Sequence, residues 1–179
     1  MPTIITHAAI PLAIGLGLGS RVIPRRLLLA GVAASILPDF DVLAFHLGIP
    51  YEHALGHRGF SHALLTAAVV GAVASFAARR LGVARAFAFA FIAISMASHG
   101  LLDMLTDGGK GVGLFWPFSD ARHFFPWHEI EVSPIGISRI FSARGIEVAV
   151  SELRWVWLPA TAACLLLRFG VRPRVKNNS

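Results

Sequence analysis

Residues 86–107 read AFAFAFIAISMASHGLLDMLTD, and this stretch decides the fold class. The apolar run around it, residues 84–105, is long enough for a helix that crosses a bilayer, which needs about 20 residues. His99, Asp103 and Asp107 follow at intervals of four, so that a helix would align them in one stripe. Ionisable groups at membrane depth are costly and usually functional. The stretch therefore predicts a membrane helix with a polar site toward one end.

The composition of the whole chain also indicates lipid as the main solvent. The 179 residues are 55% hydrophobic and only 15% charged, whereas soluble domains usually carry about 25% charge. The net charge is +6, but the basic residues form short clusters between apolar runs, a pattern typical of membrane topology. We expect one membrane-embedded domain, residues 1–179, with the lipid bilayer and not nucleic acid as its surroundings. The single cysteine, Cys164, excludes an internal disulfide and a cysteine-based zinc cluster.

Four further apolar runs predict an all-α integral membrane bundle of about five helices. The runs are residues 4–19, 27–37, 60–78 and 153–169. The last two are long enough to span. The first two are shorter, and the second reaches spanning length only if its helix continues to Phe45. Both could instead be tilted or re-entrant.

Three basic clusters predict the topology. They are Arg21, Arg25 and Arg26; Arg79, Arg80 and Arg85; and Arg168, Arg172, Arg174 and Lys176. Five crossings place all three on one side, which the excess of positive charge marks as cytoplasmic. We therefore expect a multi-pass protein of the inner (plasma) membrane, with its N-terminus outside and its C-terminus in the cytoplasm. Residues 39–59 and a long loop, residues 107–152, then face outward.

The histidines and aspartates near the ends of the apolar runs, together with Arg58, fall toward the outward face. They are His7, Asp39, Asp41, His57, Arg58, His62, His99, Asp103 and Asp107. The topology is predicted from arginine positions alone. That it places all of these residues at the same face is therefore an independent indication of one site. Imidazole and carboxylate are natural ligands for zinc, and also for manganese or iron. We predict one to three divalent ions, most simply zinc, with every residue of this set except Arg58 as a candidate ligand.

Such a site predicts hydrolysis. A bound metal makes hydroxide available near neutral pH, and Arg58 offers a donor fork for a phosphate or carboxylate. We take Arg58, Asp41 and Asp107 as the candidate catalytic residues, and a lipid phosphoester as the favoured substrate, with carboxyl esters and amides as alternatives. The glycine-rich residues 108–113, which include Lys110, could help to hold an anion. The loop also contains further polar candidates without an assigned role, namely His123, His128, Glu129 and Glu131.

Structural and functional alternatives stay open beside this interpretation. His99, Asp103 and Asp107 could form a polar seam between helices, Arg58 could snorkel to the interface, and Ser61 could cap a helix. The protein could also be a metal-ion or proton transporter, or a non-enzymatic membrane protein with a structural metal. Transport needs polar groups that continue across the membrane, and the inner halves of these helices contain almost none.

Five short motifs occur in an order that resembles the YdjM-like family of membrane-bound, metal-dependent hydrolases. They are Thr6-His7, LPDFD at residues 37–41, HRGFSH at residues 57–62, HGLLDMLTD at residues 99–107 and WPF at residues 116–118. Together they cover roughly residues 1–120. The resemblance implies an inner-membrane hydrolase.

The order of ligand-type residues is also similar, more distantly, to that of zinc-dependent phospholipase C and the related single-strand nucleases. Those proteins are all-helical and cleave phosphoesters with a three-zinc cluster. This resemblance implies a set of metal ligands made of His7, one or both of Asp39 and Asp41, His57 or His62, His99 and Asp103. Asp107 stands near the position where a further histidine would be expected.

Overall fold

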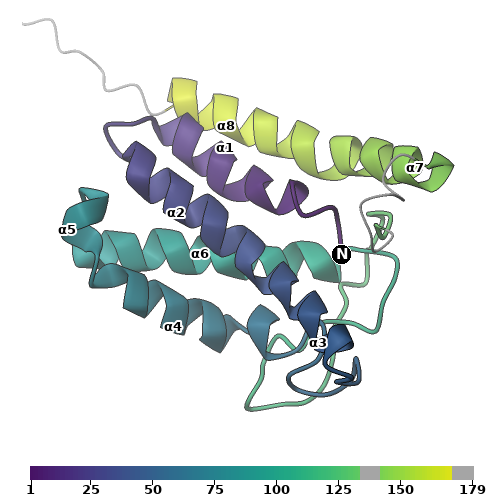
Figure 1. Cartoon of the computed structure of the whole chain (residues 1–179). Helices are drawn as coiled ribbons and strands as arrows, with labels where there is room; N and C mark the ends of the chain where they lie inside the picture. The colour runs from purple at the N-terminus through teal and green to yellow at the C-terminus, as the bar shows by residue number, and fades with distance from the viewer. Residues whose placement is uncertain (134–141, 171–179) are drawn as a thin grey trace, which may run out of the picture.

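The structure is a computed structural model that describes residues 1–133 and 142–170, and the regular elements in these ranges are all helical. The α-helices are α1 (Ala9–Leu18), α2 (Arg25–Ile36), α3 (Leu43–His46), α4 (Leu64–Ser75), α5 (Ala78–Leu81), α6 (Arg85–Met104), α7 (Ala143–Glu152) and α8 (Leu158–Gly170). Short helices accompany them, namely η1 (Thr6–Ala8), η2 (Leu37–Val42), η3 (Phe60–His62) and the π-helical η5 (Leu153–Trp157). The prediction of an all-α fold is confirmed, and the long helices lie side by side in one bundle (Figure 1).

Three helical stretches are long and apolar enough to cross a membrane. They are Arg25–His46, Arg85–Met104 and Ala143–Gly170. The second apolar run of the sequence does continue to spanning length, because α2 passes through η2 into α3. Two further apolar helices, Thr6–Leu18 and Leu64–Ser75, are shorter.

The expectation of a spanning helix over residues 60–78 is not met. Its first residues form the 3-10 turn η3, and Ala63 has an extended backbone, so that α4 begins only at Leu64. Ser61 does not cap this helix, since its hydroxyl donates to Asp41 instead. Helix α4 is therefore shorter than the apolar run, and the residues before it place the side chains of His57, Arg58 and His62 in the interior.

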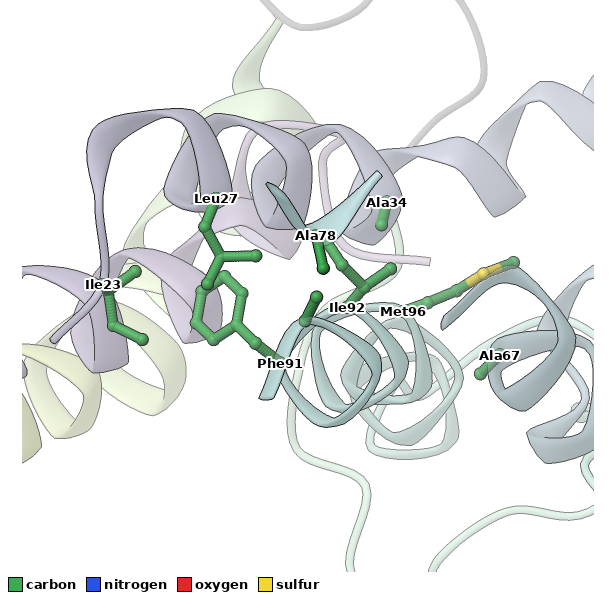
Figure 2. Packing of buried hydrophobic residues seen from close by; sticks show 9 residues of the cluster. Ile23, Leu27, Ala34, Ala67, Ala78, Phe91, Ile92 and Met96 are labelled. Carbon is green, nitrogen blue, oxygen red and sulfur yellow. The ribbon is translucent and has the colours of Figure 1, made fainter. Parts of the chain in front are cut away.

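The apolar core lies where α6 packs between α2 and α4. Figure 2 shows Leu27 of α2 facing Phe91 of α6 within this core. Glycines let the helices approach closely, as small residues do in membrane bundles. A Cβ at Gly31 would lie 2.4 Å from the Phe91 ring, and one at Gly71 would lie 2.8 Å from the Phe89 carbonyl oxygen.

The described members of the three basic clusters meet at one end of the bundle. The Arg26 guanidinium donates to the Arg80 carbonyl at 3.3 Å, and Arg21 and Arg168 line one polar cavity of about 340 Å³. The α1–α2 connection, α5 and the end of α8 lie at the left of Figure 1, whereas α3 and the long loop lie at the right. The other members of the third cluster, Arg172, Arg174 and Lys176, lie outside the described residues.

Candidate metal centre

Ionisable side chains from segments far apart in the sequence converge at the end of the bundle opposite the basic clusters. We call this set the polar cluster. Its members are His7 of η1, Asp39 and Asp41 of η2, His57 and Arg58 of the preceding loop and His62 of η3, and His99 and Asp103 of α6. All of the predicted site residues except Asp107 belong to it.

Local helix geometry directs the acidic residues of the polar cluster. His99 and Asp103 lie one turn apart on α6 and therefore share a face. Asp39 and Asp41 are two residues apart in a 3-10 helix, which has about three residues per turn, so their side chains diverge. Asp39 faces His7 and His99, whereas Asp41 faces the histidines of the 57–62 segment.

The innermost part of the cluster is a compact group of metal-ligand type. His7, His99 and Asp103 each offer an atom within 4.8 Å of those of the other two. All three side chains are fully buried, and the two imidazole rings stack with their centroids 3.6 Å apart. Asp39 lies beside them, with its carboxylate oxygens 3.8 Å from His7 Nε2 and 3.6 Å from His99 Nε2.

The hydrogen bonding of His99 leaves a lone pair pointing into this group. His99 Nδ1 lies 2.7 Å from the Ser35 carbonyl oxygen, which can only accept, so Nδ1 carries the proton. Nε2 is then the acceptor nitrogen and faces Asp39 and Asp103. A backbone carbonyl behind one ring nitrogen is the arrangement that orients metal-binding histidines.

Several buried polar atoms of the group lack hydrogen-bond partners within the described part of the chain. They are both ring nitrogens of His7 and both carboxylate oxygens of Asp39 and of Asp103. Charged neighbours do approach Asp103, since Arg58 Nε lies 3.0 Å and His62 Nε2 lies 3.2 Å from its Oδ2. Unsatisfied buried polar groups are expensive. Because one divalent ion would satisfy several of them together, the donor set fits such a metal.

Asp41 organises the outer part of the cluster. Its Oδ1 lies 2.5 Å from His57 Nδ1, and its Oδ2 accepts from the Ser61 hydroxyl at 2.6 Å and from the Arg58 backbone N–H at 2.9 Å. His62 Nδ1 lies 3.1 Å from the same Oδ2. One carboxylate thus fixes the orientation of two histidines.

His62 connects the two parts of the cluster. Its Nε2 lies 3.0 Å from His99 Nε2 and 3.2 Å from Asp103 Oδ2. Burial alone would lower the pKa of His62, but the nearby carboxylates of Asp103 and Asp41 outweigh burial and raise the pKa to about 9. The cluster therefore favours positive charge between these two carboxylates, and a proton on His62 supplies it in the protein alone.

Arg58 differs from both sequence-based expectations. It is buried and does not snorkel to the interface. Its Nη1 donates to the Gly108 carbonyl at 2.9 Å and its Nη2 to the Thr106 hydroxyl at 3.0 Å, while Nε faces Asp103. All three nitrogens thus face the chain itself. Arg58 positions Asp103 and the turn after α6, where the sequence suggested a fork open to substrate.

Asp107 is the one predicted ligand and catalytic residue that the structure leaves outside the cluster. Helix α6 ends at Met104, so the stripe of His99 and Asp103 does not continue. Asp107 accepts from the Val132 N–H at 2.7 Å and lies 3.8 Å from Arg144, with its side chain 39% exposed.

The further polar candidates of the long loop also lie outside the cluster. His123 packs edge-on against Phe115, and the ring of His128 is bonded to the Phe125 carbonyl. The loop nevertheless contributes a residue that the sequence analysis missed. Arg122 donates to the carbonyls of Tyr51 and His57, at 2.7 and 3.0 Å, and so holds the segment that carries His57 and Arg58.

Glu152 is a second residue that the sequence analysis missed. It is buried at the end of α7, and its carboxylate accepts from the backbone N–H and hydroxyl of Thr3 and from the Thr6 hydroxyl. Trp157 Nε1 also donates to the Thr6 hydroxyl, at 3.0 Å. These bonds fix the short helix on which His7 lies. An acidic residue beside an apolar run was the available signal.

Fold and site together define a helical membrane protein with a buried histidine–aspartate cluster at one end of its bundle. The chain matches the family of YdjM inner membrane proteins over residues 1–176 and belongs to that family. It is 53% identical over 162 residues to the inner membrane protein YbcI of Escherichia coli (strain K12), which covers 89% of this chain and 92% of that protein. No solved structure matches the chain. The resemblance to the YdjM-like family and the location in an inner membrane are thus supported.

Proposed function

We propose that this protein is a membrane-bound, metal-dependent hydrolase that cleaves a phosphoester, in a phospholipid-like substrate, at the outer face of the inner membrane. The observation that carries the proposal is the buried group of His7, His99 and Asp103, whose unpaired polar atoms fit a divalent ion. The resemblance to zinc-dependent phospholipase C supports the choice of a phosphoester. The positive-inside rule supports the outward orientation, because the basic clusters lie at the opposite end.

The residues of the cluster have distinct roles in this proposal. His7, His99 and Asp103 would hold the ion, with Asp39 as a further ligand. Zinc is the simplest choice, with manganese and iron as alternatives, and the ion supplies Lewis-acid activation of water and of the phosphoester. If two or three ions bind, the others would draw their ligands from Asp41, His57 and His62 (the outer part of the cluster).

Asp41 and His57 are the residues that would move the proton. Asp41 orients the His57 ring through the contact to Nδ1, as a carboxylate orients a general base. Asp41 also lines a cavity that opens at the surface of the bundle, so this pair lies on the side from which substrate would arrive.

A structural metal is the second candidate function, and one observation favours it. The side chains of His7, His99 and Asp103 are fully buried, and none of them lines the cavity that reaches Asp41. Closed coordination is typical of structural sites, whereas catalytic sites keep a position open. Transport is less favoured, since an apolar cluster that includes Leu27 and Phe91 fills the bundle toward its basic end.

Elemental analysis of the protein purified in mild detergent tests the proposal first. We expect at least one stoichiometric metal in the wild type and in an Asp107→Asn control, and its loss in a His99→Ala, Asp103→Asn double variant. A folded wild type without metal would overturn both candidate functions.

A panel of phospholipids and phosphodiesters then separates the hydrolase from the structural metal. A hydrolase cleaves at least one compound of the panel and loses that activity when a chelator removes the metal. A structural metal gives no turnover, while its removal lowers the thermal midpoint. Uptake of metal into proteoliposomes without hydrolysis would instead favour transport.

A further inference from the structure

An apolar cleft leads from the surface of the bundle to the polar cluster. It has a volume of about 460 Å³ and lies between the η2–α3 segment, η3, α4 and α6. Its walls include Leu43 of α3, Leu47 directly after it, Val70 of α4 and Met96 of α6. Both the volume and the apolar lining are typical of sites for small ligands.

The cleft has a polar end. Asp41 and Ser61 contribute to its lining and are joined by a 2.6 Å hydrogen bond. The same Asp41 carboxylate contacts His57 and His62, so this end of the cleft is the outer edge of the polar cluster. A ligand that fits must therefore have an apolar body and a polar end.

The open side of the cleft belongs to a helical stretch that is apolar and long enough to cross a membrane. Phe40, Leu43 and Leu47 line the cleft, and each is more than half exposed. All but the last of them lie within the stretch Arg25–His46. In a bilayer, the molecules that meet this side first are lipids.

The size of the cleft argues against a partner helix as its occupant. One turn of an α-helix, about 10 Å across with a 5.4 Å rise, fills about 420 Å³. The cleft is therefore about the size of one helical turn, so that it would receive only a few side chains of a partner helix. A single hydrocarbon chain is much thinner and can follow the cleft to its polar end.

We propose that this cleft binds one acyl chain of a membrane lipid and directs the polar end of that lipid toward Asp41 and Ser61. Chain binding is independent of hydrolysis. The proposed function enters only in the further step, in which the bound lipid is the phosphoester substrate.

Photo-crosslinking of a lipid tests the site directly. The probe is a monoacyl phosphocholine with a diazirine on its chain, added in trace to phosphatidylcholine vesicles that contain the full-length protein and a chelator. We expect labels on the cleft residues of the η2–α3 segment several-fold above those on Leu29, which is exposed on α2 outside the cleft. Even labelling of all exposed apolar residues would overturn the proposal.

A filling substitution supplies the matched comparison. Leu43→Trp narrows the cleft, whereas Leu29→Trp adds the same bulk at a similarly exposed position. We expect Leu43→Trp to lose the labels on the rest of the cleft and Leu29→Trp to keep them, with metal content and thermal midpoint confirming that both variants fold. Unchanged labelling in Leu43→Trp, or cross-links between two copies of the chain at Leu47, would contradict lipid binding.

Turnover distinguishes the failure of this inference from that of the proposed function. Cleft labelling without turnover of any lipid would contradict the proposed hydrolase function and support the acyl-chain site. Turnover that survives in Leu43→Trp, together with even labelling of the exposed apolar residues, would support the hydrolase function and contradict the acyl-chain site.

Discussion

Arg58 carries a backbone conformation that favours glycine, with φ at 59°. Holding a bulky residue there costs about 1–3 kcal/mol. The compensation lies at both ends of the residue, because its backbone N–H donates to Asp41 and its guanidinium faces Asp103 and the turn after α6. One residue thus joins the outer and inner parts of the polar cluster, and its strain is a cost of that link.

Substitution of Arg58 separates strain from charge. Arg58→Gly relieves the backbone but removes the buried guanidinium that pairs with the Asp103 carboxylate, a loss of about 3–5 kcal/mol. Because the second effect is larger, we expect a net destabilisation of roughly 2 kcal/mol, measured by denaturant unfolding in detergent. Arg58→Lys keeps the charge but loses the fork to Gly108 and Thr106, and should fall between Arg58→Gly and wild type. A glycine variant as stable as wild type would show that the guanidinium contributes no more than the backbone strain costs.

Residue type in an apolar context was enough to select most of the site. Ionisable groups at membrane depth stand out in any sequence, and so His7, Asp39 and Asp103 were predictable. The direction in which each side chain points was not predictable from the sequence. Arg58 turns inward, and Thr106 rather than Asp107 meets it, because of bonds to residues about 50 positions away along the chain.

At the scale of elements, the apolar runs predicted the helices but not where they end. Helix α6 stops at Met104, and the chain beyond it bonds to distant loop residues. The Phe125 N–H donates to the Met104 carbonyl, and the Asp107 N–H donates to the Ile130 carbonyl. The local sequence does not indicate these distant partners. The spacing of His99, Asp103 and Asp107 therefore predicted one helical stripe, whereas tertiary contacts end the helix before Asp107.

The contact between α4 and α6 makes a prediction for Gly71. A Cβ there would lie 2.8 Å from the Phe89 carbonyl oxygen and 2.9 Å from the Ala93 Cβ. Gly71→Ala should therefore push the helices apart and destabilise the protein by about 1–3 kcal/mol, seen as a lower thermal midpoint. Gly113→Ala is the control, because its nearest contact would be an ordinary 3.4 Å. Equal midpoints for both variants would show that the helices yield at no cost.

The hydrogen bonds by which Glu152 holds η1, which we call the Glu152 clamp, lead to a second prediction at this scale. Glu152→Gln keeps the shape of the side chain, but its amide group cannot accept from every donor that the carboxylate now serves on Thr3 and Thr6. We expect a loss of about 1–3 kcal/mol in unfolding free energy, because a buried donor is left unpaired. Weaker metal retention should accompany it, since η1 carries His7.

Glu147→Gln is the matched control for the clamp. Glu147 lies on the same helix, α7, with its side chain 62% exposed and paired with Arg144 at the surface. It should leave both stability and metal content close to wild type. Parallel losses in the two variants would attribute the effect to α7 in general and contradict a specific role for Glu152.

At the scale of the whole molecule, charge divides the bundle. The described basic clusters gather at one end and the polar cluster at the other, and the apolar core lies between them. Arginine positions alone indicated this division, because each run reverses the direction of the chain. The paths of the connecting loops were not predictable, and Arg122, which secures the segment of His57, comes from one of them.

The same division predicts the orientation of the protein in the membrane. In a Cys164→Ser background, a cysteine at Ser20 would report the basic end and one at Glu52 the end of the polar cluster, since both residues are exposed. A membrane-impermeant maleimide added to intact spheroplasts should label Glu52→Cys at once and Ser20→Cys only after permeabilisation. The reverse pattern would place the polar cluster at the cytoplasmic face. A metal site there could still be catalytic, but its lipid substrate would have to come from the inner leaflet, so the outcome decides which lipids belong in the substrate screen.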